Sequence, residues 1–174
     1  VLLPLKKRDA LSDKTMVECL YVAAGFGQVI AARASISGAE GGCQAEVGSA
    51  SGMAAAALVH ARGGTPAQMA AACAMALQNV LGLVCDPVAG LVEVPCIKRN
   101  ASGAVLAVSA AQMALAGIRS AVPPDEVIDS MRRIGRLLPA CLRETSQEGL
   151  AITPTAMEIA RRLRGNGENH PDDT

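Results

Sequence analysis

The 174-residue sequence predicts an all-α fold, a compact bundle of about six helices joined by ordered loops rich in glycine and proline. Apolar residues recur at helical spacing along most of the chain, and no alternation of strands with helices indicates a parallel sheet. Hydrophobic residues make up 51% of the chain, enough for one buried core, whereas aromatic residues make up only 1%. Alanine and glycine therefore dominate the core, and we expect closely packed helices. We assign residues 1–164 to one domain and expect residues 165–174 to be a disordered tail, because no apolar residue anchors them.

Capping residues and helix breakers set the boundaries of the predicted helices. Ser12 is placed to cap the first helix, and Thr65 forms a capping box with Gln68 at the start of the third. Asp125 and Glu126 place negative charge in the first turn of the fifth, where it favours a helix N-terminus. The six predicted helices cover residues 13–32, 44–61, 66–82, 97–116, 124–138 and 154–163.

Two loops between these helices carry residues that shape the backbone. Residues 35–43 (SISGAEGGC) include three closely spaced glycines, which permit unusual backbone angles and a close approach to a ligand. Residues 83–95 (LVCDPVAGLVEVP) combine two prolines and a glycine with β-branched residues. We expect the second loop to be ordered and buried. Within the second helix, Gly48 and Gly52 lie one turn apart and would let a neighbouring helix approach closely.

Charge and hydropathy argue against nucleic acid and membranes as partners. Lys plus Arg equals Asp plus Glu at 16 each, so the chain has no basic field to attract phosphate backbones. The longest nearly uncharged stretch, residues 101–118, falls short of the roughly 20 apolar residues that a bilayer requires. We interpret this stretch as a buried helix.

The first residues and the cysteines indicate the cellular compartment. The chain begins with VLLPLKKRD, which lacks the order of a signal peptide, where basic residues precede the apolar run. We interpret this start as a truncation or a cleavage. Six cysteines without a secretory signal are typical of a reducing compartment, where thiols stay free for metals or catalysis. The expected location is the cytoplasm.

The cysteines fall into two groups by local sequence. Cys43, Cys85 and Cys96 each lie at a loop or a loop-helix junction, beside glycine or proline. Thiolates bind iron-sulfur clusters or zinc, and three of them leave one metal position open for water or substrate. Their spacing does not resemble the short CxxC of a zinc knuckle, so spacing alone is a weak signal. The other three cysteines are predicted to be packing residues: Cys19, Cys73 and Cys141.

Three segments of the chain resemble the α chain of iron-sulfur L-serine dehydratases. They are ASISGAEGGCQAEVGSASGMAAAA, NVLGLVCDPVAGLVEVPCIKRNA and RETSQEGLAITPT, within a similarity that covers residues 16–154. The chain looks closest to the two-chain version of the enzyme, in which the α and β subunits are separate polypeptides. The resemblance implies a 4Fe-4S cluster held by Cys43, Cys85 and Cys96, with a fourth iron that lacks a protein thiolate and binds L-serine.

The resemblance also implies the reaction and the partners. Such a lyase converts L-serine to pyruvate and ammonia: the open iron polarises the β-hydroxyl while a base removes the α-proton. We assign no catalytic base here and expect it in the β subunit, whose Ser/His motif this chain lacks. Residues 1–164 would then be an N-terminally truncated catalytic domain, because the family's α chain has a Gly/Thr-rich stretch upstream. We expect activity to need that stretch and the β subunit, in an oligomer.

Polar residues around the cysteines are candidates to contact the substrate or the cluster. The serines could donate hydrogen bonds to cluster sulfides or the substrate carboxylate, and the residues after Cys96 could meet that carboxylate. The alternatives are an ordinary turn and a solvated helix start. The candidate substrate-binding residues are Ser35, Ser37, Lys98, Arg99 and Asn100. Four nearby acids are interpreted as caps or surface charges: Glu40, Glu46, Asp86 and Glu93. Neither His60 nor His170 makes a convincing base.

Two other functions remain open. A helical interaction or assembly module would use every cysteine for packing, and composition alone favours it. A zinc-dependent hydrolase would use the same three thiolates as ligands. Brown, air-sensitive protein would exclude the first, and zinc without iron or sulfide would indicate the second.

Overall fold

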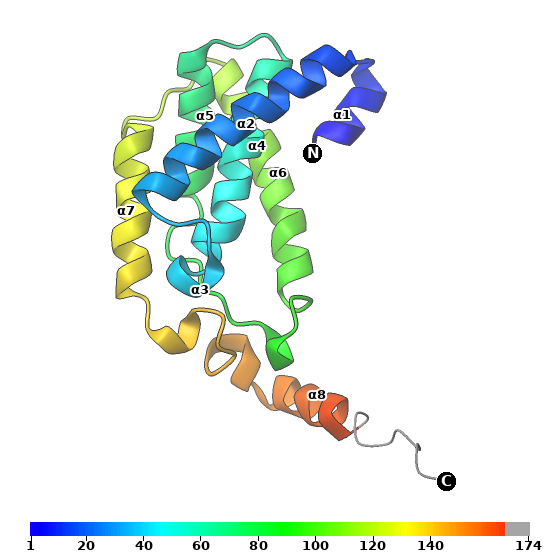
Figure 1. The fold of residues 1–174 in the computed structure, drawn as a ribbon, viewed down its shortest axis with the longest axis vertical. Coiled ribbons are helices and arrows are strands. Elements are labelled where there is room, and N and C mark those ends of the chain that lie inside the picture. Colours follow the sequence, from blue (N-terminus) through cyan, green and yellow to red (C-terminus); the bar gives the residue numbers. More distant parts are fainter. Residues whose placement is uncertain (166–174) are drawn as a thin grey trace.

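The computed structural model describes residues 1–165 and confirms the all-α fold (Figure 1). This part of the chain holds eight α-helices instead of about six, and no strand longer than an isolated bridge between Cys85 and Arg143. The predicted disordered tail, residues 165–174, lies outside the described residues except for Gly165, which ends the last helix.

Five helices form the bundle, and α4 lies at its centre, in contact with α2, α5 and α6. A side-chain carbon at Gly52 of α4 would lie 3.0 Å from Cys73 Sγ on α5, and one at Gly48 would lie 2.8 Å from a methyl group of Val80. The expected close approach of a neighbouring helix is therefore confirmed at Gly52, whereas the close neighbour of Gly48 is Val80, in the turn after α5. The bundle helices are α2 (Asp13–Arg33), α4 (Ser49–Ala61), α5 (Pro66–Gln78), α6 (Cys96–Leu115) and α7 (Pro124–Leu137).

The two predicted helix caps are confirmed. The backbone N–H of Thr15 donates to Ser12 Oγ over 3.0 Å at the start of α2. At the start of α5, Gln68 N–H donates to Thr65 Oγ1 and Thr65 N–H donates to Gln68 Oε1. The prediction that α5 extends to residue 82 is wrong, because the helix ends at Gln78 and a turn follows.

Two short α-helices were not predicted, and one predicted helix begins differently from the prediction. Helix α1 (Leu2–Asp9) buries Leu5, and three basic residues in its last turn favour its C-terminal end. Helix α3 (Gly38–Gly41) is a single turn inside the expected glycine loop. The predicted helix over 44–61 begins as a π-helical turn, Gln44–Gly48, before α4. Such π-turns are frequent at functional sites.

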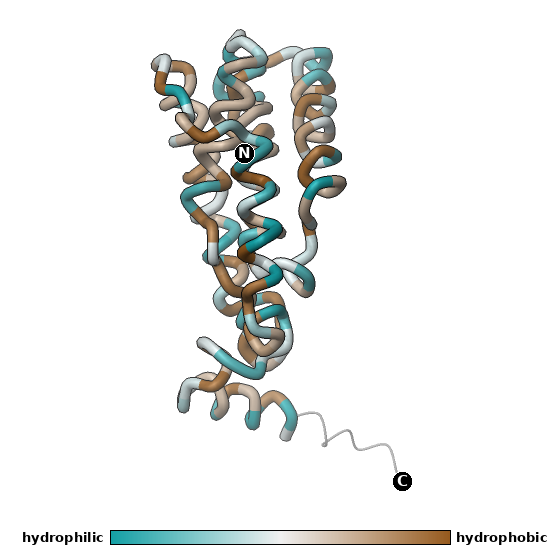
Figure 2. The backbone as a smooth tube through the Cα atoms, turned by 90° about the vertical axis from the view of Figure 1, so that its left-hand side faces the viewer, coloured by the Kyte–Doolittle hydropathy of each residue, from teal (hydrophilic) through white to brown (hydrophobic). Residues whose placement is uncertain are grey.

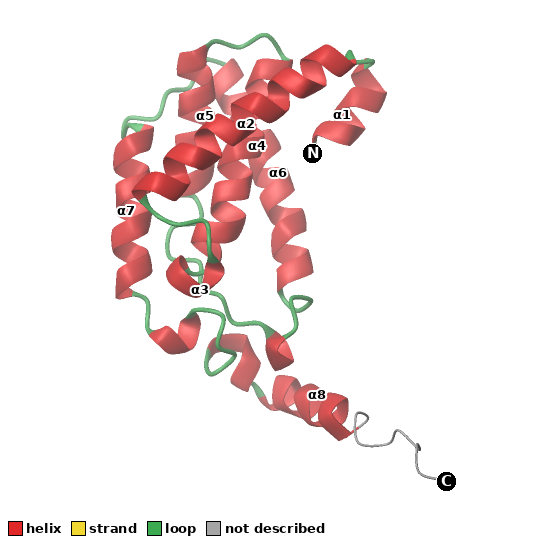
Figure 3. Cartoon of the chain, in the orientation of Figure 1, coloured by secondary structure: helices red, strands yellow, loops and turns green. Residues whose placement is uncertain are grey.

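The C-terminal part of the described chain leaves the bundle at one end (Figures 1 and 3). Two 3₁₀ turns, Ala140–Leu142 and Gly149–Ile152, lead to α8 (Pro154–Gly165). Helix α8 packs against a third 3₁₀ turn, Val88–Gly90, in the loop that follows α5. The loops that carry the predicted ligand cysteines therefore gather at this end of the bundle.

The loop over residues 83–95 is ordered, but only its first half is buried. Cys85 to Val88 are buried, whereas Leu91 to Val94 are exposed. The expectation of an entirely buried loop is therefore wrong for the second half. The hydrogen bonds from the C-terminal segment reach Cys85, Asp86 and Pro87, which all lie in the buried half.

Hydrophobic residues recur along the helices of the chain (Figure 2). The stretch over residues 101–118 lies mostly in α6, which buries one face, including Ala107 and Ala114, and exposes Val105 on the other. Within residues 1–165, one helix, α2, is long and apolar enough to cross a membrane, by length and composition alone. Val17 and Tyr21 are exposed on its outer face.

Candidate metal centre

The three predicted ligand cysteines lie at the end of the bundle where the loops meet. Cys43 lies between α3 and the π-turn, Cys85 lies in the loop after α5, and Cys96 is the first residue of α6. All three are buried, with exposures of 1%, 2% and 5%. Each is held by a different segment, so the group forms only in the folded chain.

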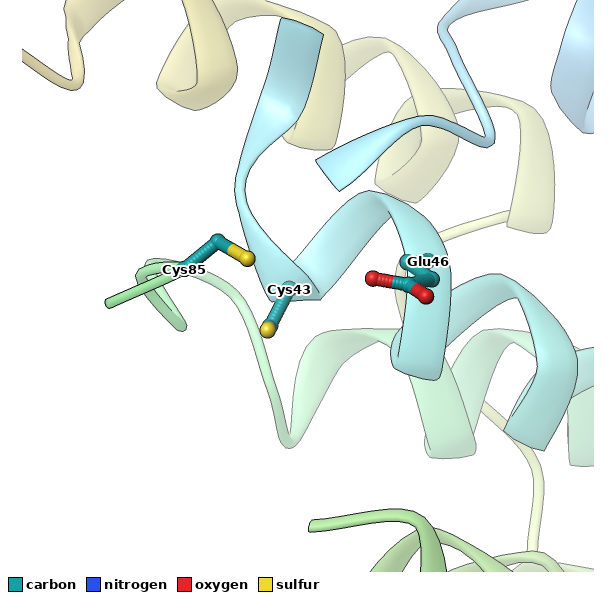
Figure 4. Close-up of side chains that lie close together, drawn as sticks. All are labelled: Cys43, Glu46 and Cys85. Carbon is teal, nitrogen blue, oxygen red and sulfur yellow. The ribbon is translucent and has the colours of Figure 1, made fainter. Parts of the chain in front are cut away.

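Two of the sulfur atoms face each other. Cys43 Sγ, Cys85 Sγ and a carboxylate oxygen of Glu46 lie within 4.8 Å of one another (Figure 4). Cys96 is not a member of this compact group, but it lies close enough for Cys43 to influence the pKa of its thiol. Burial raises the pKa of the Cys96 thiol, Cys43 raises this pKa further, and the guanidinium of Arg99 opposes the rise.

The electrostatics of the group favour a bound cation. Burial raises the pKa of the Cys85 thiol, and the adjacent Cys43 raises it again, because two thiolates side by side in a poorly solvated place repel each other. A metal ion would supply the missing positive charge and displace the protons. Cysteine sulfurs are the ligands of iron-sulfur and zinc sites, so the donor set fits either. All six cysteines are free thiols.

Glycines keep the space around the sulfur atoms open. A side-chain carbon at Gly38 would lie 3.0 Å from Glu46 Oε2 and 3.3 Å from Cys85 Sγ. Gly42, directly before Cys43, has φ of +77°, and a side-chain carbon there would lie 2.8 Å from the backbone oxygen of Leu83. The unusual backbone angle expected for this loop is confirmed at Gly42, and its expected approach to a ligand stays a prediction.

A buried glutamine fixes the π-turn that follows Cys43. The side-chain amide of Gln44 donates to the backbone oxygens of Gly41 and Met131, and its carbonyl oxygen accepts from the N–H of Gly82. These bonds tie the turn to α3, to α7 and to the chain after α5. Because Gln44 is fully buried, they are shielded from water.

An ion pair lies beside the sulfur atoms. Arg99 Nη1 donates to Asp86 Oδ1 over 2.8 Å, to the backbone oxygen of Val84 over 2.9 Å and to Cys43 Sγ over 3.7 Å. The other Asp86 oxygen accepts from the N–H of Leu150 over 2.7 Å. The interpretation of Asp86 as a cap or surface charge is therefore wrong, because the residue is 3% exposed and its carboxylate is fully engaged.

The C-terminal segment is bonded directly to the Cys85 loop. The N–H of Cys85 donates to the Leu142 oxygen over 2.9 Å, and the N–H of Glu144 donates to the Cys85 oxygen over 2.8 Å. The Glu144 carboxylate would lie 3.4 Å from a side-chain carbon at Gly38. Glu144 was not among the predicted residues; the one signal for it was the string RETSQEGLAITPT, which contains it.

The predicted substrate-binding residues separate into two groups. Ser35 donates to Glu40 Oε2 and accepts from the N–H of Ser37, which makes a local turn. Asn100 donates to the backbone oxygen four residues before it, and Lys98 is exposed. Of the five candidates, only the arginine has a recorded hydrogen bond to a sulfur atom of the group within the described residues.

The acidic residues near the cysteines also differ in whether they face the sulfur atoms. Glu40 and Glu93 are exposed, as interpreted from the sequence. Glu46 is exposed as well, but its carboxylate faces the two sulfur atoms, so its interpretation as an ordinary surface charge is incomplete. Its place on a π-turn three residues after Cys43 explains this orientation.

The remaining cysteines and histidines lie elsewhere. Cys19 and Cys73 are fully buried, and burial raises the pKa of Cys73 to about 12. Their prediction as packing residues is consistent with this burial. His60 lies 3.4 Å from Glu18 on α2, and His170 lies outside the described residues.

The fold and the site together define an all-α protein with a group of buried thiols able to hold a metal ion. The chain belongs to the serine dehydratase alpha chain family, whose model matches residues 1–151. It is 60% identical over 164 residues to a "Probable L-serine dehydratase, alpha chain" of Bacillus subtilis, which covers 94% of this chain and 55% of that protein.

Two further relatives carry similar names. The chain is 54% identical to a "Probable L-serine dehydratase, alpha chain" of Latilactobacillus sakei, over 95% of this chain and 79% of the relative. It is 50% identical to the "L-serine dehydratase, alpha chain" of Peptoniphilus asaccharolyticus, over 90% of this chain and 54% of the relative. The chain thus spans about half the length of the Bacillus and Peptoniphilus relatives.

Proposed function

We propose that this chain is the cluster-binding part of a two-chain L-serine dehydratase, a lyase that converts L-serine to pyruvate and ammonia. The observation that carries the proposal is the convergence of Cys43 and Cys85, with Cys96 beside them, in a member of the serine dehydratase alpha chain family. The three thiolates would hold a 4Fe-4S cluster. When bound, this cluster supplies a Lewis-acidic iron without a protein thiolate, which polarises the β-hydroxyl of serine.

The surrounding residues bury the sulfur atoms and leave the exposed carboxylate of Glu46 facing them. Gly38 leaves room next to Cys85, and Gln44 holds the turn after Cys43. We place the Glu46 carboxylate against the α-ammonium group of the bound serine, because it is exposed and faces the sulfur pair. A negative charge at this point orients the amino acid relative to the metal.

The base and the complete active site belong to the assembled enzyme. Within the described residues the single histidine is His60, which faces Glu18, so no histidine lies ready to remove the α-proton. We propose that the β subunit supplies this base, that the enzyme is an oligomer, and that it acts in the cytoplasm. The names of the relatives, which specify an alpha chain, support a partner chain.

The test is a pyruvate assay after anaerobic reconstitution with iron and sulfide. The chain and its complete α subunit are each assayed with L-serine, with and without the β subunit. We expect pyruvate only when the reconstituted complete α subunit and the β subunit are combined, and none from a zinc-loaded preparation. Pyruvate from the zinc-loaded protein, or none from the complete reconstituted enzyme, would contradict the proposal.

A matched pair of variants tests Glu46 in the same assay. Glu46→Gln removes the charge beside the sulfur atoms while it keeps the volume of the side chain, so the KM for L-serine should rise. Glu93→Gln removes an exposed charge from the neighbouring loop and should leave KM unchanged. Equal KM values for the two variants would show that Glu46 does not contribute to the binding of L-serine.

A further inference from the structure

The Arg99–Asp86 pair is the most deeply buried ion pair found in residues 1–165. The Asp86 side chain is 4% exposed and the Arg99 side chain 18% exposed, whereas the other ion pairs have at least one partner that is more than a quarter exposed. Burying two charges is costly, and removing one partner of such a pair leaves the other uncompensated. Unlike the exposed ion pairs, this buried pair does not serve to keep the protein surface soluble, and its burial needs another explanation.

The arginine side chain points its charge at a sulfur atom. Its Nη1 atom donates to Cys43 Sγ over 3.7 Å, an acceptable length for a hydrogen bond to sulfur. The same nitrogen is held by Asp86 and by the backbone oxygen of Val84, so the guanidinium cannot turn away without breaking three contacts. Among the described residues, the Arg99 guanidinium is the one cation that donates a hydrogen bond to a sulfur atom of Cys43, Cys85 or Cys96.

Asp86 is in turn fixed by the C-terminal segment. Its second oxygen accepts from the N–H of Leu150, and Gly149 packs directly against the carboxylate, with no space for a side chain. Ser146 Oγ donates to the backbone oxygen of Pro87 over 2.5 Å, next to Asp86 in the chain. The position of the arginine thus depends on contacts far from it in the sequence.

We propose that Arg99 sets the reduction potential of the metal centre by its N–H···S bond to Cys43, and that Asp86 is the positioning residue that holds Arg99 there. This inference rests on the proposed function, because it assumes a 4Fe-4S cluster on these cysteines. The potential of such a cluster depends on its charge and on hydrogen bonds to its sulfur atoms. A guanidinium that donates to a ligand sulfur stabilises the extra negative charge of the reduced cluster and so raises the potential.

The sequence suggested a different role for Arg99, contact with the substrate carboxylate, and the two roles give different results. An arginine that binds substrate changes KM for L-serine and leaves the potential of the substrate-free protein unchanged. An arginine that acts on Cys43 changes the potential with no substrate present. The potential is therefore the decisive readout.

The experiment is a redox titration of the anaerobically reconstituted chain, followed by electron paramagnetic resonance, in the absence of L-serine. For Arg99→Gln, we expect the potential to fall by about 59 mV, the equivalent of a tenfold change in a one-electron equilibrium. Asp86→Asn should shift it in the same direction by less. Arg99→Lys, which keeps the charge without the planar fork, should lie between Arg99→Gln and the unmodified chain.

Lys98→Gln is the matched control, because it removes a positive charge from the adjacent, exposed position of the same helix. Its potential should equal that of the unmodified chain, since water screens this charge. Equal shifts in Lys98→Gln and Arg99→Gln, or no shift in any Arg99 variant that binds a full cluster, would overturn the inference alone. Failure of the unmodified chain to assemble a cluster would overturn the inference together with the proposed function.

Discussion

Some of the residues around Cys43, Cys85 and Cys96 could be predicted from the sequence, and others could not. The three cysteines were singled out by the glycine and proline beside them, and the family resemblance implied that they hold a cluster; the structure buries all three, with Cys43 and Cys85 in one compact group. Glu46, Asp86 and Glu144 were not assigned to the site, because an acid looks the same in sequence whether it faces solvent or a sulfur atom. Contacts between distant segments place Asp86 and Glu144, such as the approach of Glu144 to Gly38, whereas the π-turn after Cys43 places Glu46.

Gly38 tests the space around the sulfur atoms. In Gly38→Ala, the added methyl group would lie 3.0 Å from Glu46 Oε2 and 3.3 Å from Cys85 Sγ, so these groups must move. We expect less iron bound per chain after reconstitution, measured by metal analysis. Gly25→Ala on α2 is the control, because its methyl group would meet nothing within 4 Å. Equal iron contents in the two variants would show that the site tolerates the displacement.

Cys73 makes the metal-free protein sensitive to alkali. Burial raises its pKa from 9.0 to about 12, so the folded chain keeps a proton that the unfolded chain loses above pH 9. This contribution to stability is complete below the unfolded pKa and disappears as the pH rises through the folded pKa. The free energy of unfolding should therefore fall by up to about 1.4 kcal/mol per pH unit in this window.

Denaturant titrations across this pH window check the prediction. Cys85, whose pKa is also raised by burial, contributes to the same fall, so the comparison is between slopes. Cys73→Ala should show a shallower decline than the unmodified chain, whatever its stability at neutral pH. Parallel declines in the two proteins would mean that Cys73 does not keep its proton in the folded state.

At the level of elements, the sequence predicted the five bundle helices and α8 and missed the short helices α1 and α3. Only α2 and α5 among the bundle helices have a side-chain cap, so caps are not what separates the predicted helices from the missed ones. Ser12 and Thr65 marked α2 and α5 correctly, since side-chain oxygens at these positions accept backbone N–H groups. The single turn of α3 and the π-turn after it have no such side-chain caps. Their conformation is imposed by tertiary contacts, among them the bonds of the buried Gln44.

The capping box of α5 gives a prediction at this level. Thr65→Ala removes the acceptor for the Gln68 N–H and should lower the free energy of unfolding by about 1 kcal/mol. Thr155→Ala, at an exposed position in the first turn of α8, should change it by less than about 0.5 kcal/mol. Equilibrium unfolding in urea measures both. A Thr65→Ala loss no larger than that of Thr155→Ala would argue against the cap.

In the molecule as a whole, a rigid bundle supports a site built from loops. Alanine and glycine let α4 pack closely among its neighbours, as the composition predicted. The segment from Ala140 to Ile152 then closes over Cys85 at one end of the bundle (Figure 1). The sequence placed the helices but not this closure, because it depends on backbone bonds between residues that carry no distinctive side-chain signal.

The central claim is that three distant cysteines form one iron-sulfur centre, and metal analysis of cysteine variants tests it most directly. After anaerobic reconstitution, iron and acid-labile sulfide are measured in the unmodified chain, in the triple variant Cys43→Ser/Cys85→Ser/Cys96→Ser, and in Cys141→Ser. The account predicts about four irons and four sulfides per chain in the unmodified protein and in Cys141→Ser, and none in the triple variant. Iron and sulfide retained by the triple variant, or zinc alone in the unmodified chain, would contradict it.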